Sequence, residues 1–253
     1  MADFHPLPSL TKTTSPAFDA LDKEAEKRAK ECVEAPMPSV NHLSMKDYNQ
    51  VYEPSDDTYL LLDGILLAMM ESTNEQKPFI TLEIGCGTAV PTVFLGMQLE
   101  ERIPDHKHTH IVTDINPEAL RVAQATASAN GVSGLMTHEC DLASALLPEQ
   151  QGCIDILLFN PPYVPTPDEE VGSKGIEASW AGGVNGRRVV DRALPQMASL
   201  LKKESGVAYM ITVDDNLPEQ LACVFQELGL KMEPWVRRRA RNEYLSVQRI
   251  SWK

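Results

Sequence analysis

The chain has 253 residues, of which 43% are hydrophobic, and its formal net charge at pH 7 is -13. This length suits one α/β domain with an appendage. The acidic charge disfavours proteins that bind free nucleic acid, since phosphate contacts need Lys and Arg, and it favours a neutral or basic partner.

The first 46 residues differ from the rest of the chain. Residues 1–17 are rich in Pro, Ser and Thr and show no apolar period, and residues 18–34 are dense in charge, which predicts a solvated helix. We therefore expect an N-terminal extension over residues 1–46, mobile or partly helical, followed by a single domain over residues 47–253. A regulatory or docking arm is the functional alternative for the extension.

Strand and helix patterns alternate after residue 47. Short apolar runs predict strands over residues 79–84, 109–114, 135–141, 154–159, 206–213, 230–236 and 244–250. Helical spacing of apolar residues predicts helices over residues 58–70, 90–99, 116–130, 186–202 and 217–228. Repeated β-α units predict an α/β fold with a seven-stranded, mostly parallel sheet and helices on both faces.

A glycine-containing turn joins the first predicted strand to the next helix. Residues 83–89 read Glu-Ile-Gly-Cys-Gly-Thr-Ala. Glycines allow a ligand to approach the backbone, and the following helix offers free N–H groups. Position 90 is Val rather than the third glycine of a dinucleotide site, so the pattern favours a ligand without a pyrophosphate. An ordinary tight connection is the alternative.

Two aspartates end the second and third predicted strands. Asp114 is placed to accept hydrogen bonds from both hydroxyls of a ribose, and Asp141 to bond an adenine amino group. Taken singly, each has a simpler interpretation, as a helix N-cap or a surface carboxylate. Their positions on successive strand ends favour a nucleoside site.

The fourth predicted strand ends in the motif Asn160-Pro161-Pro162-Tyr163. Two prolines fix the backbone, so the Asn160 side chain and the Pro161 carbonyl have set directions and can accept hydrogen bonds from an NH₂ group. Tyr163 offers an aromatic face for a planar amide or base. The motif predicts chemistry on such a nitrogen, and a rigid loop with a packed Tyr is the alternative.

Together these features resemble the Rossmann-like class I methyltransferases, which depend on S-adenosylmethionine (SAM). Longer stretches resemble one branch, the eukaryotic and archaeal HemK-like glutamine methyltransferases of the class I translation release factor. These stretches are VYEPSDDT at 51–58, TDINPE at 113–118, FNPPYV at 159–164, EVGS at 170–173, WAGG at 180–183 and GR at 186–187. The similarity covers residues 51–252, with the last stretch less clear.

The resemblance implies methylation of the side-chain amide nitrogen of the glutamine in the release factor's Gly-Gly-Gln loop. It gives the catalytic positions as Asn160, Pro161, Pro162 and Tyr163. It gives the SAM-binding positions as Thr58, Glu83, Gly85, Gly87, Asp114, Asp141 and Asn160. Ala89 departs from the family, in which many members carry a third glycine, and we expect an altered helix start there rather than lost binding.

The resemblance also implies a partner, because eukaryotic members work with a small zinc-binding activator subunit. In the sheet order of this fold class, the third strand near residues 135–140 lies at an edge. It carries Leu135, Met136 and Cys140 but neither Lys nor Pro, so it has little of the usual protection of an edge strand. We therefore expect a heterodimer, and a strand shielded by the chain's own N-terminal residues is the alternative.

Three other functions fit the same motifs. An adenine-N6 methyltransferase would act on the same planar NH₂, but such enzymes usually need a basic groove and a region that reads the target. A protein lysine methyltransferase would want a group that deprotonates the ammonium. A non-catalytic SAM-binding scaffold would need no Asn-Pro-Pro-Tyr loop.

Two charged groups have open roles. Asp56 or Asp57 could act as a base, although an N-cap for the helix over residues 58–70 is simpler. The cluster Arg237, Arg238, Arg239 and Arg241 falls between the last two predicted strands and is expected to be a solvated hairpin turn, with contact to an acidic partner surface as the alternative.

The cysteines and the termini add expectations about the compartment. Five cysteines form no C-x-x-C pair and have no histidine at zinc-ligand spacing, which predicts reduced thiols and no metal site in this chain. No secretory signal or bilayer-spanning stretch is apparent in the sequence, so no membrane association is expected. A cytoplasmic protein is therefore expected, with room for a nuclear pool.

Overall fold

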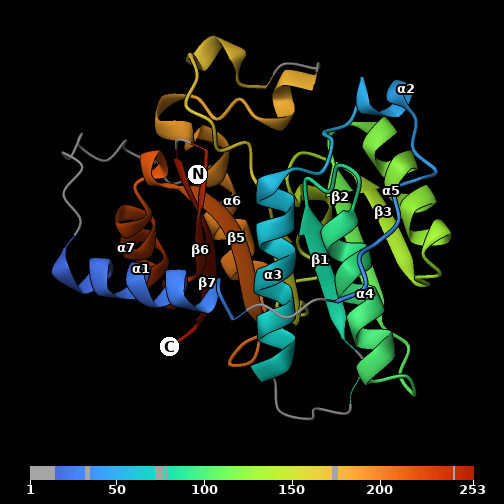
Figure 1. The fold of residues 1–253 in the computed structure, drawn as a ribbon, viewed down its shortest axis with the longest axis horizontal. Coiled ribbons are helices and arrows are strands. Elements are labelled where there is room, and N and C mark those ends of the chain that lie inside the picture. The colour runs from blue at the N-terminus through green and yellow to red at the C-terminus, as the bar shows by residue number, and fades with distance from the viewer. Residues whose placement is uncertain (1–14, 32–34, 72–76, 78, 173–175, 242) are drawn as a thin grey trace.

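The computed structural model describes residues 15–31, 35–71, 77, 79–172, 176–241 and 243–253. One sheet with the strand order β3-β2-β1-β4-β5-β7-β6 runs through the molecule (Figure 1). Neighbours from β3 to β5 pair in parallel, and β7 pairs antiparallel with both β5 and β6. The predicted seven-stranded, mostly parallel sheet is confirmed.

The strands are β1 (Ile80–Ile84), β2 (Thr109–Asp114), β3 (Leu135–Glu139), β4 (Ile156–Phe159), β5 (Val207–Val213), β6 (Leu230–Ala240) and β7 (Glu243–Trp252). The helices are α1 (Pro16–Arg28), α2 (Met45–Tyr48), α3 (Asp56–Glu71), α4 (Val90–Arg102), α5 (Pro117–Ala129), α6 (Arg188–Leu200) and α7 (Pro218–Glu227). The ends of the central strands and helices fall within a few residues of their predicted places.

Local sequence explains where the helices begin. Asn116 precedes α5, and its side chain accepts a hydrogen bond from the N–H of Glu118 at 3.0 Å, while Pro117 occupies the first helical position. Ala89 precedes α4 with φ 55° and ψ 24°, the left-handed conformation that glycine adopts without strain. Ala89 therefore occupies a backbone conformation that suits the glycine found in many family members.

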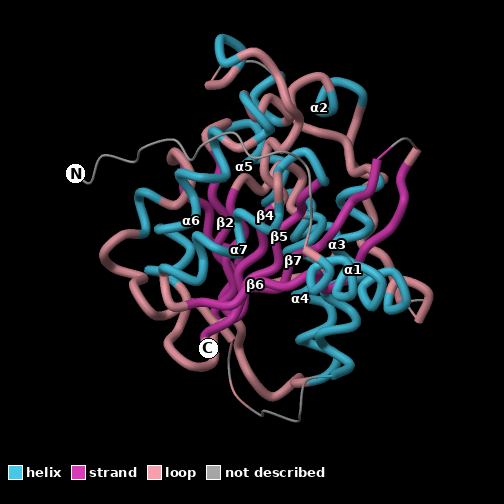
Figure 2. The backbone as a smooth tube through the Cα atoms, turned by 90° about the vertical axis from the view of Figure 1, so that its left-hand side faces the viewer, coloured by secondary structure: helices cyan, strands magenta, loops and turns pink. Residues whose placement is uncertain are grey.

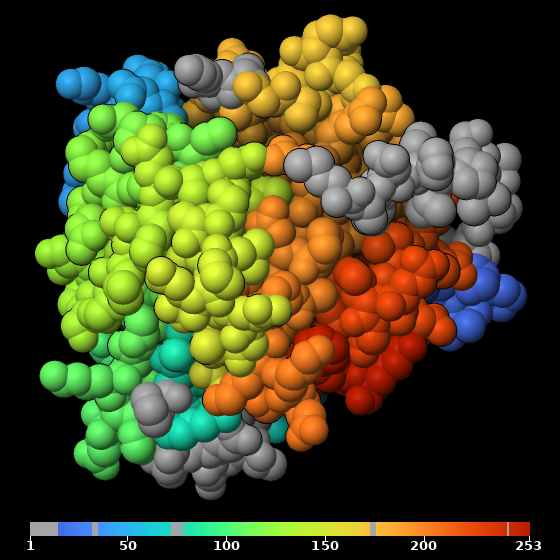
Figure 3. Space-filling view, turned by 180° about the vertical axis from the view of Figure 1, so that it is seen from behind, coloured from blue at the N-terminus to red at the C-terminus, as the bar shows by residue number. Residues whose placement is uncertain are grey.

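Helices lie on both sides of the sheet, as the side view in Figure 2 shows, and a hydrophobic layer lies between the sheet and the helices on each side. Residues of α3 and α4 pack on one face, against β4, β5, β6 and β7. Residues of α6 and α7 pack on the other face, the side seen in Figure 3. Gly64 lets α3 approach the sheet closely, because a Cβ there would lie 3.1 Å from Val247. The two buried layers supply the main driving force for folding.

The N-terminal helix α1 is not a solvated helix. Phe18 and Ala25 are buried, and the guanidinium of Arg28 lies 4.5 Å from the ring centre of Trp235 on β6. Figure 1 shows α1 lying across the last two strands. Only two apolar positions of a charge-dense segment reach the core, which is why composition alone suggested a solvated face. The expectation for residues 1–14 and 32–34 lies outside the described residues.

The last hairpin is longer than predicted, so the expectation that the arginines form a turn is wrong for three of the four, although Arg238 and Arg239 are exposed to solvent as expected. Arg237, Arg238 and Arg239 lie within β6, and Arg241 is in the turn. Arg237 is buried and donates to both carboxylate oxygens of Asp214, at 2.8 and 3.2 Å. The charge of Arg237 is therefore neutralised within the fold, which allows this residue to lie in a buried part of the strand.

Candidate active site

The predicted site residues lie at the carboxyl ends of the parallel strands, which point upward in Figure 1. This side of the sheet is called its carboxyl edge, as distinct from the edge strands β3 and β6. In open α/β sheets this edge is where ligands bind. Gly85 and Gly87 follow β1, Asp114 ends β2, and Asn160 follows β4. The pairing of β1 with both β2 and β4 brings these three positions side by side.

The glycine turn leaves open space for a ligand. Gly85 has φ 65° and Gly87 has φ 49°, conformations that side chains rarely adopt. A Cβ built on Gly85 would meet nothing within 4 Å, so room exists above the turn. The Gly87 N–H donates to Asp114 Oδ2 at 3.0 Å, which ties the turn to the end of β2.

Asp114 is the acidic group of this part of the site. Its Oδ1 accepts from the N–H of Asn116 at 2.9 Å, so both carboxylate oxygens are already held by backbone N–H groups. Burial raises the pKa of Asp114 above its usual range, and these N–H groups lower it in part. A fixed, buried carboxylate beside an open glycine turn can accept ribose hydroxyls.

Glu83 faces away from the open turn. Its Oε2 accepts from the N–H of Thr92 at 3.0 Å and from the Thr92 hydroxyl, within the first turn of α4. Burial raises the pKa of Glu83 to about 8. The side chain therefore fixes the start of α4 against β1, which supports the glycine turn from behind.

Asp141 lies apart from the other predicted cofactor residues. It follows β3, is half exposed and forms an ion pair with Arg192 of α6. The structure thus connects Asp114 with the glycine turn but does not bring Asp141 to them by direct contact.

Asp57 organises the Asn-Pro-Pro-Tyr motif. Its Oδ2 accepts from Asn160 Nδ2 at 3.0 Å and from the Tyr163 hydroxyl at 3.3 Å. Asp57 is buried in the first turn of α3, which begins at Asp56, so the expectation of an N-cap before residue 58 is wrong. Sequence reasoning placed Asp57 at the right helix end but missed this link across 103 positions of the chain.

The amide of Asn160 is left with one free acceptor. Its Nδ2 is used by Asp57, while its Oδ1 is buried and has no hydrogen-bond partner. Leaving a buried acceptor unpaired costs about 1–3 kcal/mol, so such an atom calls for a partner outside the chain. Because Asp57 fixes the orientation of the amide, the oxygen is the group offered to a bound N–H.

Thr58 and Tyr163 complete this side of the site. Thr58 is buried beside Asp57, and its hydroxyl accepts from the Ser55 N–H at 3.3 Å. Burial and the charge of Asp57 raise the pKa of Tyr163 above its usual range, so the phenol stays neutral and keeps donating. Thr58 and Tyr163 thus share with Asn160 the same hydrogen-bond partner, Asp57.

The segment after the motif folds back over this edge of the sheet. It contains the short helices η2 (Asp168–Glu170), η3 (Ile176–Ser179) and η4 (Val184–Gly186), and Val164 pairs with Ala181 in a β-bridge. Residues 164–172 and 176–187 are called the flap below. Ser173, part of the EVGS stretch, lies outside the described residues.

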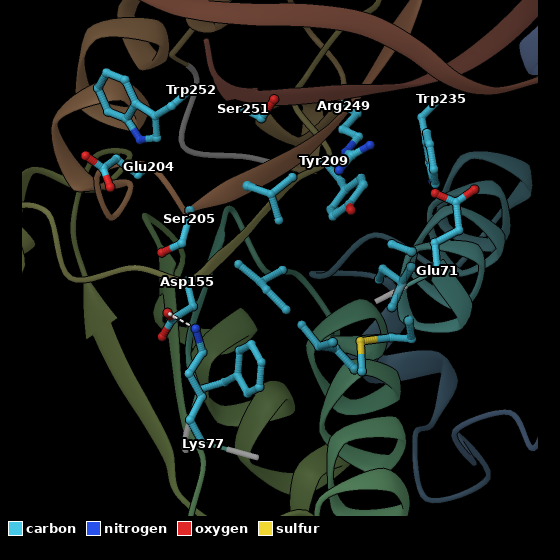
Figure 4. A pocket seen from close by; sticks show the side chains of 18 residues that line it. Glu71, Lys77, Asp155, Glu204, Ser205, Tyr209, Trp235, Arg249, Ser251 and Trp252 are labelled. Atoms are coloured by element: carbon cyan, nitrogen blue, oxygen red, sulfur yellow. Dashed lines mark ion pairs between the residues drawn. The ribbon is translucent and has the colours of Figure 1, made fainter. Parts of the chain in front are cut away.

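A separate cavity of about 410 Å³ lies at the opposite edge of the sheet (Figure 4). Lys77, Asp155 and Ser205 line it, and they precede or begin β1, β4 and β5. Because it is at the amino ends of these strands, it is not continuous with the Asn160 site. We assign no part of the chemistry to it.

The residues present fit a nucleoside-containing methyl donor. The open space over Gly85, the buried carboxylate of Asp114 and the orphaned Oδ1 of Asn160 lie on three adjacent strand ends. Within the described residues, no group of three or more His, Cys, Asp or Glu is arranged to hold a metal ion. Among those same residues, no helix is long and apolar enough to cross a membrane.

Comparison with known proteins identifies relatives of this chain. Residues 63–178 match the family described as methyltransferase small domain. Methyltransferase HEMK2 of Mus musculus is 42% identical over 216 residues, which cover 85% of this chain and 96% of the mouse protein. The eRF1 methyltransferase catalytic subunit mtq2 of Schizosaccharomyces pombe is 33% identical over 223 residues, covering 84% of this chain and 94% of the yeast protein.

Two solved structures of methyltransferases also resemble this chain. The E. cuniculi Mtq2-Trm112 complex, described as responsible for methylation of the eRF1 translation termination factor, superposes with a TM-score of 0.57 at 26% identity and covers 80% of this chain and 99% of that chain. A ribosomal protein L11 methylase from Lactobacillus delbrueckii, at 17% identity and a TM-score of 0.55, shares the fold.

Proposed function

This chain belongs to the HemK-like release factor glutamine methyltransferases, and from that premise we propose that it methylates the glutamine of the Gly-Gly-Gln loop of the class I translation release factor. The methyl group goes from SAM to the side-chain amide nitrogen. The single observation that carries the chemistry is the buried, unpartnered Oδ1 of Asn160.

The motif supplies a binding frame for a primary amide. Asn160 Oδ1 accepts one substrate N–H and the Pro161 carbonyl accepts the other, so the nitrogen lone pair is turned toward the methyl donor. Asp57 holds Asn160 Nδ2 at 3.0 Å, which keeps the amide from presenting its NH₂ to the substrate. An amide nitrogen is a poor nucleophile, and accurate alignment supplies much of the rate in such reactions.

The cofactor would be held by the residues over and beside the glycine turn. SAM supplies, when bound, a methyl group on a positively charged sulfur. Gly85 and Gly87 would give it room, Asp114 would accept hydrogen bonds from its ribose hydroxyls, and Thr58 and Asn160 would contribute to binding beside the substrate. Glu83 acts indirectly by fixing α4 through Thr92. Asp141 contributes once its carboxylate is shared with or released by Arg192.

No residue of the motif is free to act as a general base. Asp57 Oδ2 already accepts from Asn160 and from the Tyr163 hydroxyl. The substrate proton therefore leaves to solvent after methyl transfer, when the nitrogen has become acidic. An amide can thus be methylated without a base that acts first, whereas the ammonium group of lysine must lose a proton before its nitrogen can attack.

A small zinc-binding activator subunit is the proposed partner, added at the open edge of the sheet. The solved E. cuniculi relative is a complex with Trm112, and β3 is one of the two edge strands here, the position that the sequence predicted for it. Met136 on β3 is 48% exposed. A partner strand would satisfy the free backbone groups of β3 and cover this side chain.

A cytoplasmic location follows from the role in translation termination.

The test compares substrates with labelled SAM. The activator-bound enzyme is expected to label the release factor and to leave an adenine-containing oligonucleotide unlabelled. Asn160→Ala removes the proposed acceptor and is expected to abolish transfer in an enzyme that still folds, as thermal melting checks, and still binds SAM through Gly85, Gly87 and Asp114. Transfer to the oligonucleotide in preference to the release factor, or full activity of a folded Asn160→Ala enzyme, would overturn the proposal.

A further inference from the structure

Asn216 is a buried asparagine that the substrate frame above does not include. It ends the short helix η5 (Asp214–Asn216), directly after β5, and is fully buried. Its Oδ1 accepts from the Val213 N–H at 2.8 Å. Its Nδ2 donates to the carbonyls of Tyr163 at 2.8 Å and Asn185 at 2.9 Å. Every polar atom of the side chain is used.

The two carbonyls belong to two segments of the chain, the motif and the flap. Tyr163 is the last residue of the Asn-Pro-Pro-Tyr motif, and Asn185 lies in η4 at the end of the flap. Asn216 thus joins the end of a central strand to both. Asp214, two residues earlier, is itself held by Arg237 at 2.8 and 3.2 Å, so the residue that makes the junction rests on a fixed turn.

The junction is packed so closely that the flap can meet the motif only through glycine. Gly186 has φ 66°, and a Cβ there would lie 1.8 Å from the Tyr163 carbonyl oxygen and 2.5 Å from Asn216 Nδ2. A Cβ on Gly182 would lie 2.4 Å from the Pro162 carbonyl oxygen. The GG and GR stretches of the flap therefore serve this contact.

This contact bears on where the substrate acceptors sit. Pro161 and Pro162 restrict φ within the motif, and Asp57 holds the Asn160 and Tyr163 side chains. The motif backbone is attached to the sheet at one end by Phe159, which pairs with Ile84 and Met210 of the neighbouring strands. At the other end, the Tyr163 carbonyl is held by Asn216. Without Asn216, the motif would keep its side-chain contacts with Asp57 but would lose the backbone contact that fixes its far end.

We propose that Asn216 is a positioning residue for amide methylation, which holds the Asn-Pro-Pro-Tyr motif and the flap in one fixed arrangement. This inference rests on the proposed function. Asn216 touches neither substrate nor cofactor. It acts through the backbone of Tyr163 and Asn185, and it sets the place of the two acceptors that receive the substrate N–H groups.

The test uses Asn216→Asp, which keeps size and the acceptor for Val213 but replaces both donors with a carboxylate oxygen. A displacement of about 1 Å costs on the order of 100-fold in rate, so kcat on the release factor is expected to fall about 100-fold. SAM affinity is expected to change by less than about threefold, because Gly85, Gly87 and Asp114 belong to the ends of β1 and β2, which Asn216 does not contact.

Asn130→Asp is the matched control. Asn130 also accepts one hydrogen bond, from the Ser39 N–H at 2.6 Å, and donates two, to the carbonyls of Ser39 at 2.9 Å and Thr126 at 2.8 Å. It lies at the end of α5, away from the motif. The control is expected to keep kcat within about threefold of the unmodified enzyme.

Hydrogen exchange gives a readout that needs no substrate. In the unmodified enzyme, residues 163–166 and 182–187 are expected to exchange with the same protection, because one junction holds both. In Asn216→Asp both lose protection while β1 and β2 keep theirs. If that variant does not fold, Asn216→Ser, which leaves room for a bridging water, replaces it with the same expectations.

Three results would overturn the proposal. They are unequal protection of the two segments in the unmodified enzyme, a kcat within about threefold of normal for a folded Asn216 variant, or a loss of activity matched by equal loss of SAM affinity. If the unmodified enzyme fails to methylate the release factor, the proposed function fails instead, and the hydrogen-exchange comparison still decides whether Asn216 holds the two segments.

Discussion

At the scale of single residues, the site depends on which atom of an amide is left free. Asn160 could present either its oxygen or its NH₂ to a substrate, and only the oxygen can accept from a primary amide. The buried carboxylate of Asp57 makes the choice by binding Nδ2. The same carboxylate holds the Tyr163 hydroxyl, so one charge orders both ends of the motif.

Asp57→Asn tests this choice. The new amide can bond Asn160 in either orientation, so part of the population would present the wrong atom to the substrate. A hydrogen bond to a charged group contributes about 1.5–3 kcal/mol, which predicts a fall in kcat of roughly 10- to 150-fold. The measurement is kcat for the release factor beside SAM affinity by calorimetry, which is expected to stay nearly constant.

Asp56→Asn is the control for this change, since Asp56 is exposed in the same turn of α3. It removes one negative charge without touching Asn160, and its activity is expected to equal that of the unmodified enzyme. If Asp56→Asn and Asp57→Asn lose activity equally, the effect is one of charge and the orienting role of Asp57 is wrong.

At the scale of elements, helix α1 is attached through a group of charges around Arg237. Asp22 and Glu26 of α1 lie 3.7 and 3.5 Å from this guanidinium, which also binds Asp214. Burial raises the pKa of Asp22 from 3.8 to about 6, against the opposing effect of Arg237. Asp22 Oδ1 is buried without a hydrogen-bond partner.

The pKa of Asp22 predicts that α1 is held more tightly in mild acid. A carboxyl whose folded-state pKa is raised stabilises the fold fully below its unfolded pKa, near 4, and loses that contribution as the pH rises through about 6. Hydrogen exchange of residues 16–28, corrected for intrinsic rates, is therefore expected to show stronger protection at the acidic end of this window.

Asp22→Asn is expected to remove most of that pH dependence. Glu24→Gln changes an exposed carboxylate on the same helix and is expected to leave the dependence in place. Protection of α1 that rises with pH between 4 and 6 in the unmodified protein would contradict the assignment.

The open edge strand β3 carries the second prediction at this scale. Met136→Lys places a charge where a partner strand would pack, and it is expected to weaken the complex with the zinc-binding activator while the lone chain keeps its fold. Met70→Lys is the matched control, since Met70 is 50% exposed at the far end of α3. Copurification of the two chains measures the effect, and equal binding by both variants would exclude β3 as the partner's strand.

The elements themselves were largely predictable, and the exceptions have a physical reason. The run Ile-Leu-Leu-Phe in β4 is buried on both faces of the sheet. Because such a strand is apolar at every position, its composition predicts a central strand. Arg237 to Arg239 suggested a turn because the acids that neutralise Arg237 come from α1 and η5, far away in sequence. The motif residues were likewise predictable, whereas the links of Asp57 and Asn216 to the motif arise only on folding.

At the scale of the whole molecule, the parts of the reaction come from distant stretches of the chain. The turn after β1, the end of β2 and the motif after β4 meet at one edge of the sheet, and the flap returns to the same place. This arrangement leaves an opening above the glycine turn, since a Cβ built on Gly85 would meet nothing within 4 Å. The net charge of -13 disfavours nucleic acid at that opening, in agreement with a protein substrate.

The proposed reaction places the methyl group on one atom, the side-chain amide nitrogen of the glutamine. The most direct measurement is mass spectrometry of the release factor after incubation with SAM and the enzyme–activator pair, with fragmentation to place the added methyl group. We expect the methyl group on the glutamine side chain of the Gly-Gly-Gln loop. We expect no methylation when that glutamine is replaced by alanine or when the enzyme carries Asn160→Ala. A methyl group found on a lysine, or one that persists after the glutamine is replaced, would contradict it.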